Sequence, residues 1–301
     1  MSTPSFSTTN ASAQQTQDSL LTVTSLQKHF PLKQGSILQW LPGQKTQKSF
    51  FHAVDGIDFS IQPGESVGLV GESGCGKSTL TRLIARLLEP TAGQITFEGV
   101  DISQVPISAF ARSPQRGDLQ MVFQDPNDSL NPRFTAFNTI TEPIKRLGFK
   151  QERRSPQWLK QRATELATQV GLSPELLSRF PHQLSGGQNA RVGIARAIST
   201  NPKLLILDEP TSALDVSVQA VILRLLADLR ERLGMSYLFI SHDLNVVRLL
   251  CDRILVMHRG KLVETGPTDA IFNHPQHPYT QALIAAIPRF ERASTSGSTL
   301  D

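Results

Sequence analysis

The sequence predicts an α/β fold with a mainly parallel central sheet, and two observations support this prediction. Four short apolar runs are typical of buried parallel strands, which are covered on both faces: SVGLV (66–70), LLIL (204–207), YLFI (237–240) and ILVM (254–257). Helical patterns lie between them, and repeated alternation of strand and helix is typical of α/β domains. The 301 residues, 39% of them hydrophobic, suffice for one large domain or two smaller ones.

The first half of the chain predicts more strands and then a helical region. We expect early strands at LLTVTSL (20–26) and AVDGIDFSI (53–61), and another at GQITFEG (93–99). Residues 126–180 show helical patterns and several prolines but no convincing strand, so we expect an inserted α-helical subdomain over about residues 126–185.

Four further helices are expected between the strands. One is KSTLTRLIARLLE, and the others span 187–199, about 216–233 and about 243–251. In the first, one apolar face is predicted to carry Leu80, Leu83, Ile84, Leu87 and Leu88.

The ends of the chain are polar, and they predict disordered tails at 1–19 and 291–301 around a domain at 20–290. The N-terminus lacks the basic and apolar regions of a secretory signal, and no apolar run reaches the roughly 18 residues of a membrane span. Cys75 and Cys251 have neither zinc-site nor disulfide spacing, which fits a reducing compartment. The net charge of +4 suits an acidic ligand, nucleic acid or an anionic membrane without choosing among them.

GESGCGKST (71–79) fits the pattern G-x-x-x-x-G-K-[ST] between a predicted strand and a predicted helix. Such a loop wraps its backbone N–H groups round a phosphate, while Lys77 reaches the β- and γ-phosphates and Ser78 binds Mg²⁺. A chance glycine-rich turn is the alternative, and the flanking elements argue against it. The predicted phosphate-binding loop consists of Gly71, Glu72, Ser73, Gly74, Cys75, Gly76, Lys77, Ser78 and Thr79.

Polar residues follow three other apolar runs, where the carboxyl ends of parallel strands place ligands. In LLILDEP, Asp208 is expected to hold Mg²⁺ and Glu209 to orient the attacking water or accept its proton. His242 in YLFISHD is a candidate γ-phosphate sensor, and Gln124 in MVFQDP opens the helical region. From these residues alone, a structural or merely exposed role stays open for His242 and Gln124.

PHQLSGGQNAR (181–191) places Ser185, Gly186 and Gly187 just before a predicted helix. A helix N-terminus with glycines allows an anion to approach its unpaired N–H groups. An ordinary helix cap formed by Ser185 is the alternative, and this stretch alone does not decide between them.

Taken together, these motifs resemble the nucleotide-binding subunits of ABC transporters. GESGCGKST resembles the Walker A loop, Gln124 the Q-loop glutamine, LSGGQ (184–188) the signature, LLILDE Walker B, SALD (212–215) the D-loop, and His242 the switch histidine. Their order matches from about residue 20 to 290. The resemblance implies a P-loop NTPase with a mainly parallel core sheet, an antiparallel β subdomain and an inserted α-helical subdomain.

The resemblance also implies ATP hydrolysis coupled to transport, with ATP and Mg²⁺ as cofactors. Two such domains meet head to tail, so that the signature of one faces the phosphate held by the other. Ser185, Gly186, Gly187, Gln188 and Asp215 are the expected contacts of this second kind. Lys77, Gln124, Glu209 and His242 are the expected catalytic residues, and Ser78, Gln124 and Asp208 the expected metal ligands.

Three segments resemble the peptide and nickel importer branch: FQDPNDSLNPR (123–133), HPQHPYTQALIAAIP (274–288) and QKHFPLKQG (27–35), the last typical of its second ATPase subunit. The implied partners are a second ATPase subunit, two transmembrane permeases and an extracytoplasmic solute-binding protein, at the cytoplasmic face of the inner membrane, with no nucleic acid. Nickel, metallophore or opine import stays open. A soluble ABC ATPase acting on ribosomes or DNA is less favoured, because the chain has one cassette and no room for a long coiled coil.

Phe30 matches the aromatic residue that stacks on adenine in this branch, but Phe50, Phe51 and His52 compete with it. The chain departs from the family at Asn189 and Ala190, which replace a polar pair after the signature, and the absence of further cysteines predicts no iron–sulfur cluster.

Two polar segments favour plain structural roles. A surface turn is expected at His274 and His277 rather than a metal site, and residues 150–162 predict a solvated helical face rather than a lipid contact.

Overall fold

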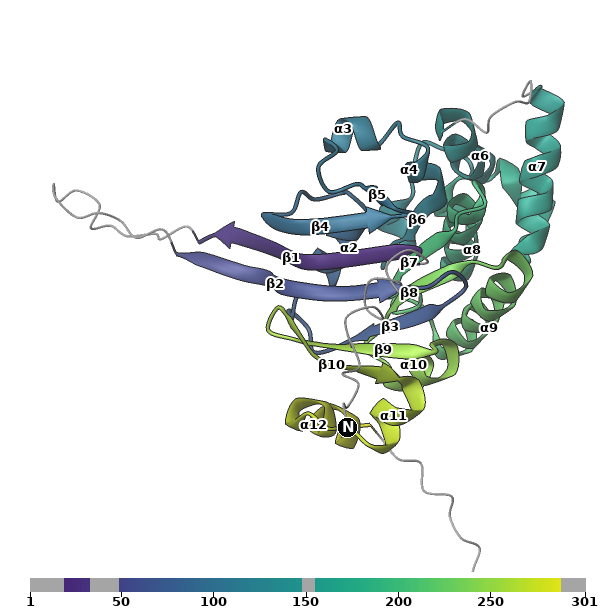
Figure 1. Cartoon of the computed structure of the whole chain (residues 1–301). Helices are drawn as coiled ribbons and strands as arrows, with labels where there is room; N and C mark the ends of the chain where they lie inside the picture. Colours follow the sequence, from purple (N-terminus) through teal and green to yellow (C-terminus); the bar gives the residue numbers. More distant parts are fainter. Residues whose placement is uncertain (1–18, 33–48, 148–154, 288–301) are drawn as a thin grey trace, which may run out of the picture.

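The computed structural model describes residues 19–32, 49–147 and 155–287, and its strands form two sheets (Figure 1). Nearly all of the two predicted tails lies outside these residues. The smaller sheet has four antiparallel strands in the order β2-β1-β4-β5. Its strands are β1 (Leu21–Pro31), β2 (Phe50–Ile61), β4 (Ala92–Phe97) and β5 (Val100–Asp101).

The larger sheet has six strands in the order β10-β9-β3-β8-β7-β6. All neighbouring pairs are parallel except β10 with β9, so the prediction of a mainly parallel core sheet is confirmed. The edge strand β10 was not predicted. The strands are β3 (Ser66–Val70), β6 (Leu119–Val122), β7 (Leu204–Asp208), β8 (Ser236–Ile240), β9 (Arg253–His258) and β10 (Lys261–Pro267).

Both faces of the larger sheet are buried, which explains why its strands are apolar without alternation. In β7, Leu204 and Ile206 join the core shared with the antiparallel sheet and with α2 (Lys77–Ile84). Leu205 and Leu207 point into the opposite core, which α8 (Gly186–Ile198) and its neighbouring helices cover. The sheet therefore separates two hydrophobic cores.

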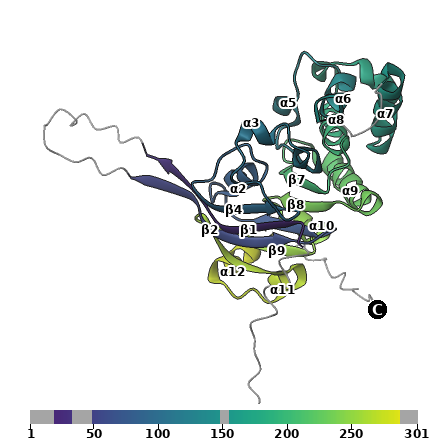
Figure 2. The same cartoon turned by 45° about the horizontal axis from the view of Figure 1, so that its top comes forward.

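Helices at Gly186–Ile198, Val216–Leu233 and Leu244–Leu250 match three predicted ones closely, whereas short helices at Ile107–Phe110, Gln115–Asp118, Thr268–Asn273 and Pro278–Ala285 were not predicted. Helices α5, α6 and α7 group at one end of the molecule, beside α8 and away from the β1–β2 pair (Figure 2). The bounds are α3 (Ile107–Phe110), α4 (Gln115–Asp118), α5 (Pro126–Ser129), α6 (Ala136–Leu147), α7 (Pro156–Gln169), α9 (Val216–Leu233), α10 (Leu244–Leu250), α11 (Thr268–Asn273) and α12 (Pro278–Ala285), with 3₁₀ turns at Pro174–Ser178 and Pro181–Gln183. Within the described ranges, none of the helices combines the length and apolarity that a membrane span requires.

The predicted length of the helix after the phosphate-binding loop was wrong. Helix α2 ends at Ile84, because Arg86 adopts a left-handed backbone conformation with φ of 52° that a helix does not accommodate. Leu87 lies beyond that point and is 41% exposed, and Leu88 is only partly buried. Apolar periodicity therefore continued past the true end of the helix.

Candidate functional site

The phosphate-binding loop (residues 71–79) connects β3 to α2, and two of its glycines have positive φ where other chain segments press against them. A Cβ atom on Gly71 (φ 151°) would lie 2.1 Å from the carbonyl oxygen of Met257. One on Gly76 (φ 113°) would lie 2.1 Å from the carbonyl oxygen of Ala53. Glycine is therefore required at both positions to fold the loop against β9 and β2.

Lys77 is buried at the start of α2, and its ammonium group faces back across the loop. Its Nζ donates hydrogen bonds to the carbonyl oxygens of Gly71 (2.7 Å) and Glu72 (2.8 Å). Helix α2 has Gly76 as its N-cap and receives no side-chain cap. The N–H groups of its first turn and the Lys77 ammonium are thus donors that suit a phosphate.

Asp208, at the end of β7, is buried next to the start of α2. Its Oδ2 atom lies 3.5 Å from the Thr81 hydroxyl, while Oδ1 is buried with no hydrogen-bond partner among the described residues. Burial, and after it the Glu209 carboxylate, raise the pKa of Asp208. The Thr81 hydroxyl also donates a hydrogen bond to the Ser78 carbonyl at 3.1 Å, which links the two predicted metal ligands. Carboxylate and hydroxyl oxygens are ligands that Mg²⁺ prefers, so these residues fit the predicted metal.

Glu209 follows directly, and its carboxylate is held between two side chains from neighbouring strand ends. Gln124 Nε2 donates a hydrogen bond to Glu209 Oε2 at 3.2 Å, and His242 Nδ1 lies 3.2 Å from the same oxygen. The backbone of Glu209 has a φ of 46°, a strained conformation for a non-glycine residue that typically marks functional sites. Its N–H donates to the carbonyl of Ile240, which fixes this turn against the end of β8.

Lys77, Gln124, Glu209 and His242 line one pocket of about 540 Å³, whereas the buried Asp208 is not among its lining residues. This pocket lies where strand ends of the larger sheet meet the phosphate-binding loop, as expected for ligands in α/β folds. The pocket brings together four residues whose catalytic roles were predicted from sequence. Its lining consists of Phe51, Ala53, Ser73, Gly74, Gly76, Lys77, Ser78, Thr79, Gln124, Glu209 and His242.

A second pocket of about 370 Å³ adjoins the first, and the two share Phe51, Ser73 and Gly74. Phe51 thus lines both spaces, whereas Phe30 lines neither of them. Phe30 is nevertheless the cross-strand partner of Phe51 in the β1–β2 register and is 37% exposed. His52 lines the second pocket and Phe50 lines neither of them. Which of Phe30, Phe50, Phe51 and His52 stacks on adenine stays open.

The predicted signature residues lie elsewhere. Ser185, Gly186, Gly187 and Gln188, at the start of α8, do not line either pocket described above, and neither does Asp215, the exposed N-cap of α9. Ser185 and Gly186 are exposed to solvent. The chain therefore does not bring this second set of predicted phosphate contacts to its own phosphate-binding loop.

Local packing explains the residues of the signature segment (184–188). Ser185 Oγ accepts the N–H of Gln188 at 3.3 Å, and Gln188 Oε1 accepts the N–H of Ser185 at 2.9 Å, which is a capping box. A Cβ atom on Gly187 would lie 2.7 Å from Val218 Cγ1 of α9. The glycine thus allows α8 to start close to α9 while leaving Gly186 open to solvent.

The departure from the family after the signature is accommodated inside the protein. Asn189 is buried, and its side-chain amide donates a hydrogen bond to the Pro181 carbonyl at 3.0 Å. Arg191 donates to the Val170 carbonyl. These residues hold the start of α8 to the preceding turns and do not face the pocket.

One contact with the phosphate-binding loop escaped the sequence interpretation. The Tyr279 hydroxyl, in the HPYT segment, accepts a hydrogen bond from the Glu72 N–H at 2.8 Å. The sequence of this segment predicts a surface turn and resembles a branch of the family, and neither observation points to this contact. No local pattern indicates where its side chains lie.

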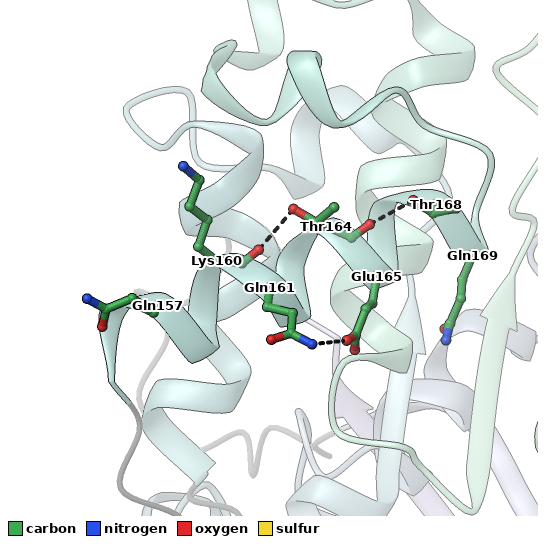
Figure 3. Close-up of a pocket in the computed structure, with 7 residues that line it drawn as sticks. All are labelled: Gln157, Lys160, Gln161, Thr164, Glu165, Thr168 and Gln169. Atoms are coloured by element: carbon green, nitrogen blue, oxygen red, sulfur yellow. Dashed lines mark hydrogen bonds between the residues drawn. The ribbon is translucent and has the colours of Figure 1, made fainter.

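Other candidate surfaces have structural explanations. His277 is the N-cap of α12, and its Nδ1 accepts the N–H of Tyr279 at 3.1 Å, rather than forming a metal site with His274. The exposed polar face of α7 carries a shallow open depression that this single helix lines (Figure 3). This depression fits a solvated helical face for the described part of residues 150–162.

His29, His52 and Asp55 form the one metal-like cluster found among the described residues. The imidazole rings of His29 and His52 stack with centroids 3.8 Å apart. Lys261 Nζ, however, lies 3.3 Å from Asp55 Oδ2. The Lys261 ammonium thus already pairs with the Asp55 carboxylate. The cluster is therefore explained as a surface ion pair beside two stacked imidazole rings, without a metal ion.

Sequence comparisons with known proteins identify relatives of this chain. Residues 54–212 match the family model of the ABC transporters, and residues 263–300 match that of the oligopeptide/dipeptide transporter C-terminal region. A probable peptide ABC transporter ATP-binding protein of Sinorhizobium fredii is 49% identical over 271 residues, which cover 90% of this chain and 73% of that protein. The oligopeptide transport ATP-binding protein AppF of Bacillus subtilis is 44% identical over 90% of this chain and 79% of its own length.

Solved structures show the same fold. A dimeric ATP-binding cassette in a post-hydrolysis state, bound to ADP and phosphate, superimposes with a TM-score of 0.71 at 27% identity, covering 82% of this chain and 98% of that one. A subunit of a Clostridium perfringens ABC transporter complex gives a TM-score of 0.67 at 28% identity, covering 85% of this chain and 92% of that one.

Proposed function

Because the chain belongs to the ABC transporter ATP-binding proteins, and carries the C-terminal region of their oligopeptide/dipeptide branch, we propose that it hydrolyses ATP at the pocket described above to energise peptide import. The single observation that supports this most is the position of Glu209. Its carboxylate contacts both Gln124 and His242, in the same pocket as Lys77.

Each side chain has a distinct role in this proposal. Lys77 exchanges its loop carbonyls for the β- and γ-phosphates, and the N–H groups at the start of α2 hold the same phosphates. Glu209 orients the attacking water and accepts its proton, while His242 and Gln124 fix the Glu209 carboxylate and sense the γ-phosphate. Ser78, Asp208 and Gln124 would hold Mg²⁺, which neutralises charge on the transferring phosphoryl group.

The second set of phosphate contacts requires a partner. Ser185, Gly186, Gly187, Gln188 and Asp215 do not line this chain's own pocket, and Ser185 and Gly186 are exposed to solvent. We propose that they complete the ATP site of a second ATPase subunit, as a head-to-tail dimer allows. The solved neighbour in a post-hydrolysis state is itself dimeric.

Transport requires membrane subunits. We propose that the chain works at the cytoplasmic face of the inner membrane with two permeases, a second, different ATPase subunit and an extracytoplasmic solute-binding protein. The curated relatives named above are peptide and oligopeptide transport proteins, which favours peptides as cargo. Nickel complexes, metallophores and opines are the alternative cargo within the same branch.

A pair of experiments tests the proposal. The tagged chain is purified from its native membranes in mild detergent, and the proteins that accompany it are identified by mass spectrometry. We expect two multi-span permeases and a second ATPase; ribosomal or DNA-bound proteins without a permease would contradict the transport role.

The purified complex then serves to test Glu209→Gln. This variant should bind ATP as the wild type does and hydrolyse it about 10²–10⁴-fold more slowly, since it lacks the general base. Wild-type turnover would mean that Glu209 is not the residue that activates water.

A further inference from the structure

Tyr279 links the C-terminal helices to the phosphate-binding loop. Its hydroxyl accepts the Glu72 N–H at 2.8 Å, and its ring stacks on His258 with centroids 4.0 Å apart and an interplanar angle of 14°. Helix α12, which carries Tyr279, lies beside β9 and β10 (Figure 1). The tyrosine is thus held by one contact to the strand end of β9 and by another to the loop itself.

The peptide group between Gly71 and Glu72 is held from both sides. Its carbonyl accepts a hydrogen bond from Lys77 Nζ at 2.7 Å, and its N–H donates to Tyr279. A peptide that both donates and accepts is polarised, and each bond strengthens the other. When Lys77 moves to a phosphate, the carbonyl loses its partner, and Tyr279 still holds this first part of the loop.

Helix α12 is itself fastened to β10. The two carboxylate oxygens of Glu264 accept the N–H groups of Gln276 (2.8 Å) and His277 (3.0 Å), and His277 caps the helix. Burial opposes ionisation of Glu264, but the backbone N–H groups of Gln276 and His277 stabilise the carboxylate, and the pKa of this carboxyl group is lowered. Glu264 is therefore ionised at neutral pH, and its two hydrogen bonds attach the start of α12, which carries Tyr279, to β10.

We propose that Tyr279 is a positioning residue for ATP binding: through the Glu72 N–H it fixes the first part of the phosphate-binding loop in the conformation that accepts the phosphates. The docking of the C-terminal segment onto β9 and β10 thereby sets the nucleotide affinity of the site. This inference rests on the proposed ATPase function. It assigns the HPYT segment (277–280) a role in positioning the phosphate-binding loop.

Tyr279→Phe tests the inference, because it removes only the hydroxyl and keeps the ring on His258. Tyr237→Phe is the matched control. Tyr237 lies at the start of β8, outside the pocket, and its hydroxyl donates a hydrogen bond to the carbonyl of Leu226 in α9. Binding of a fluorescent ATP analogue with Mg²⁺ is measured on the full-length chain, and KM and kcat on the purified complex.

Tyr279→Phe should raise Kd and KM by about two- to tenfold, the range expected for one neutral hydrogen bond, and leave kcat unchanged. Amide exchange at Glu72 should become faster. Tyr237→Phe should leave Kd, KM and the Glu72 exchange rate as in the wild type.

The outcomes separate the two proposals. A Tyr279→Phe chain with wild-type Kd and wild-type melting temperature would overturn the inference, as would an equal rise of Kd in Tyr237→Phe. A wild-type chain that binds no ATP would instead overturn the proposed function, and this inference with it. Should Tyr279→Phe fold poorly, Glu264→Gln weakens the attachment of the same end of α12, at Gln276 and His277, and should also raise Kd. An unchanged Kd there would contradict the role of α12.

Discussion

The starts of α2 and α8 are two helix N-termini of the same kind, and they differ in what surrounds them. At α2, a glycine without a side-chain cap begins the helix, and the loop, Lys77 and three strand ends enclose the space in front of it. At α8, Ser185 forms a capping box and the next residue, Gly186, is open to solvent. Both ends present N–H groups to an anion.

The difference matches the proposed function, in which the chain itself encloses the phosphate site at α2 and a second subunit completes the one at α8. An uncapped helix start has N–H groups without hydrogen-bond partners in the helix, and a bound anion can satisfy them. The capping box at α8 satisfies part of this requirement within the chain, so the start of α8 does not depend on a bound anion for its stability.

The largest expected effect concerns the α2 end. Lys77→Ala should raise the Kd for ATP of the isolated full-length chain by roughly 10- to 100-fold, because charge-assisted hydrogen bonds to phosphate are lost. Lys160→Ala, on the open face of α7 (Figure 3), removes an equal charge away from the pocket and should change nothing. An unaltered Kd in Lys77→Ala would show that α2 does not begin at the ATP site.

An intermediate effect is expected at the α8 end, and only in the assembled transporter. Gly187→Val would force its side chain against Val218 and obstruct the N–H groups of the first turn. The isolated chain should keep its Kd for ATP, while the turnover of the complex falls by about tenfold or more, as when one transition-state donor is lost.

The matched control for Gly187 lies on the same helix. A Cβ atom on Gly193 meets nothing within 4 Å, so Gly193→Ala should preserve turnover. If Gly187→Val weakened ATP binding by the isolated chain, the two helix ends would belong to one site, and the comparison would fail.

The smallest effect is on stability. Ser185→Ala removes the side-chain cap of α8 and should lower the free energy of unfolding by about 1 kcal/mol, as measured by urea denaturation without nucleotide. Ser78→Ala, in the first turn of α2, removes no cap and should leave that free energy unchanged. Equal losses in both variants would remove the structural distinction between the two ends.

Much of the site followed from sequence because its residues occupy strand ends. Asp208, Glu209, His242 and Gln124 each follow an apolar run, and the carboxyl ends of parallel strands meet at one edge of a sheet. The structure accordingly brings Gln124 and His242 to the Glu209 carboxylate.

The parts that escaped prediction depend on contacts between distant segments or on single backbone angles. Glu72 and Tyr279 are 207 positions apart, so no local pattern links them. The end of α2 depends on the left-handed backbone of Arg86, which is unusual for a non-glycine residue. Phe30 and Phe51 are cross-strand neighbours, and sequence alone does not reveal which of them borders the pocket.

The strand order β10-β9-β3-β8-β7-β6 also bears on when the phosphate-binding loop gains a folded sheet beside it. Strand β3, which leads into the phosphate-binding loop, pairs with β8 and β9, and these come from the last quarter of the chain. Contacts between such distant segments form slowly, because a long loop must close before any pairing energy is gained. A nascent chain on the ribosome therefore carries residues 71–79 long before β8 and β9, the two strands that pair with β3, have been synthesised.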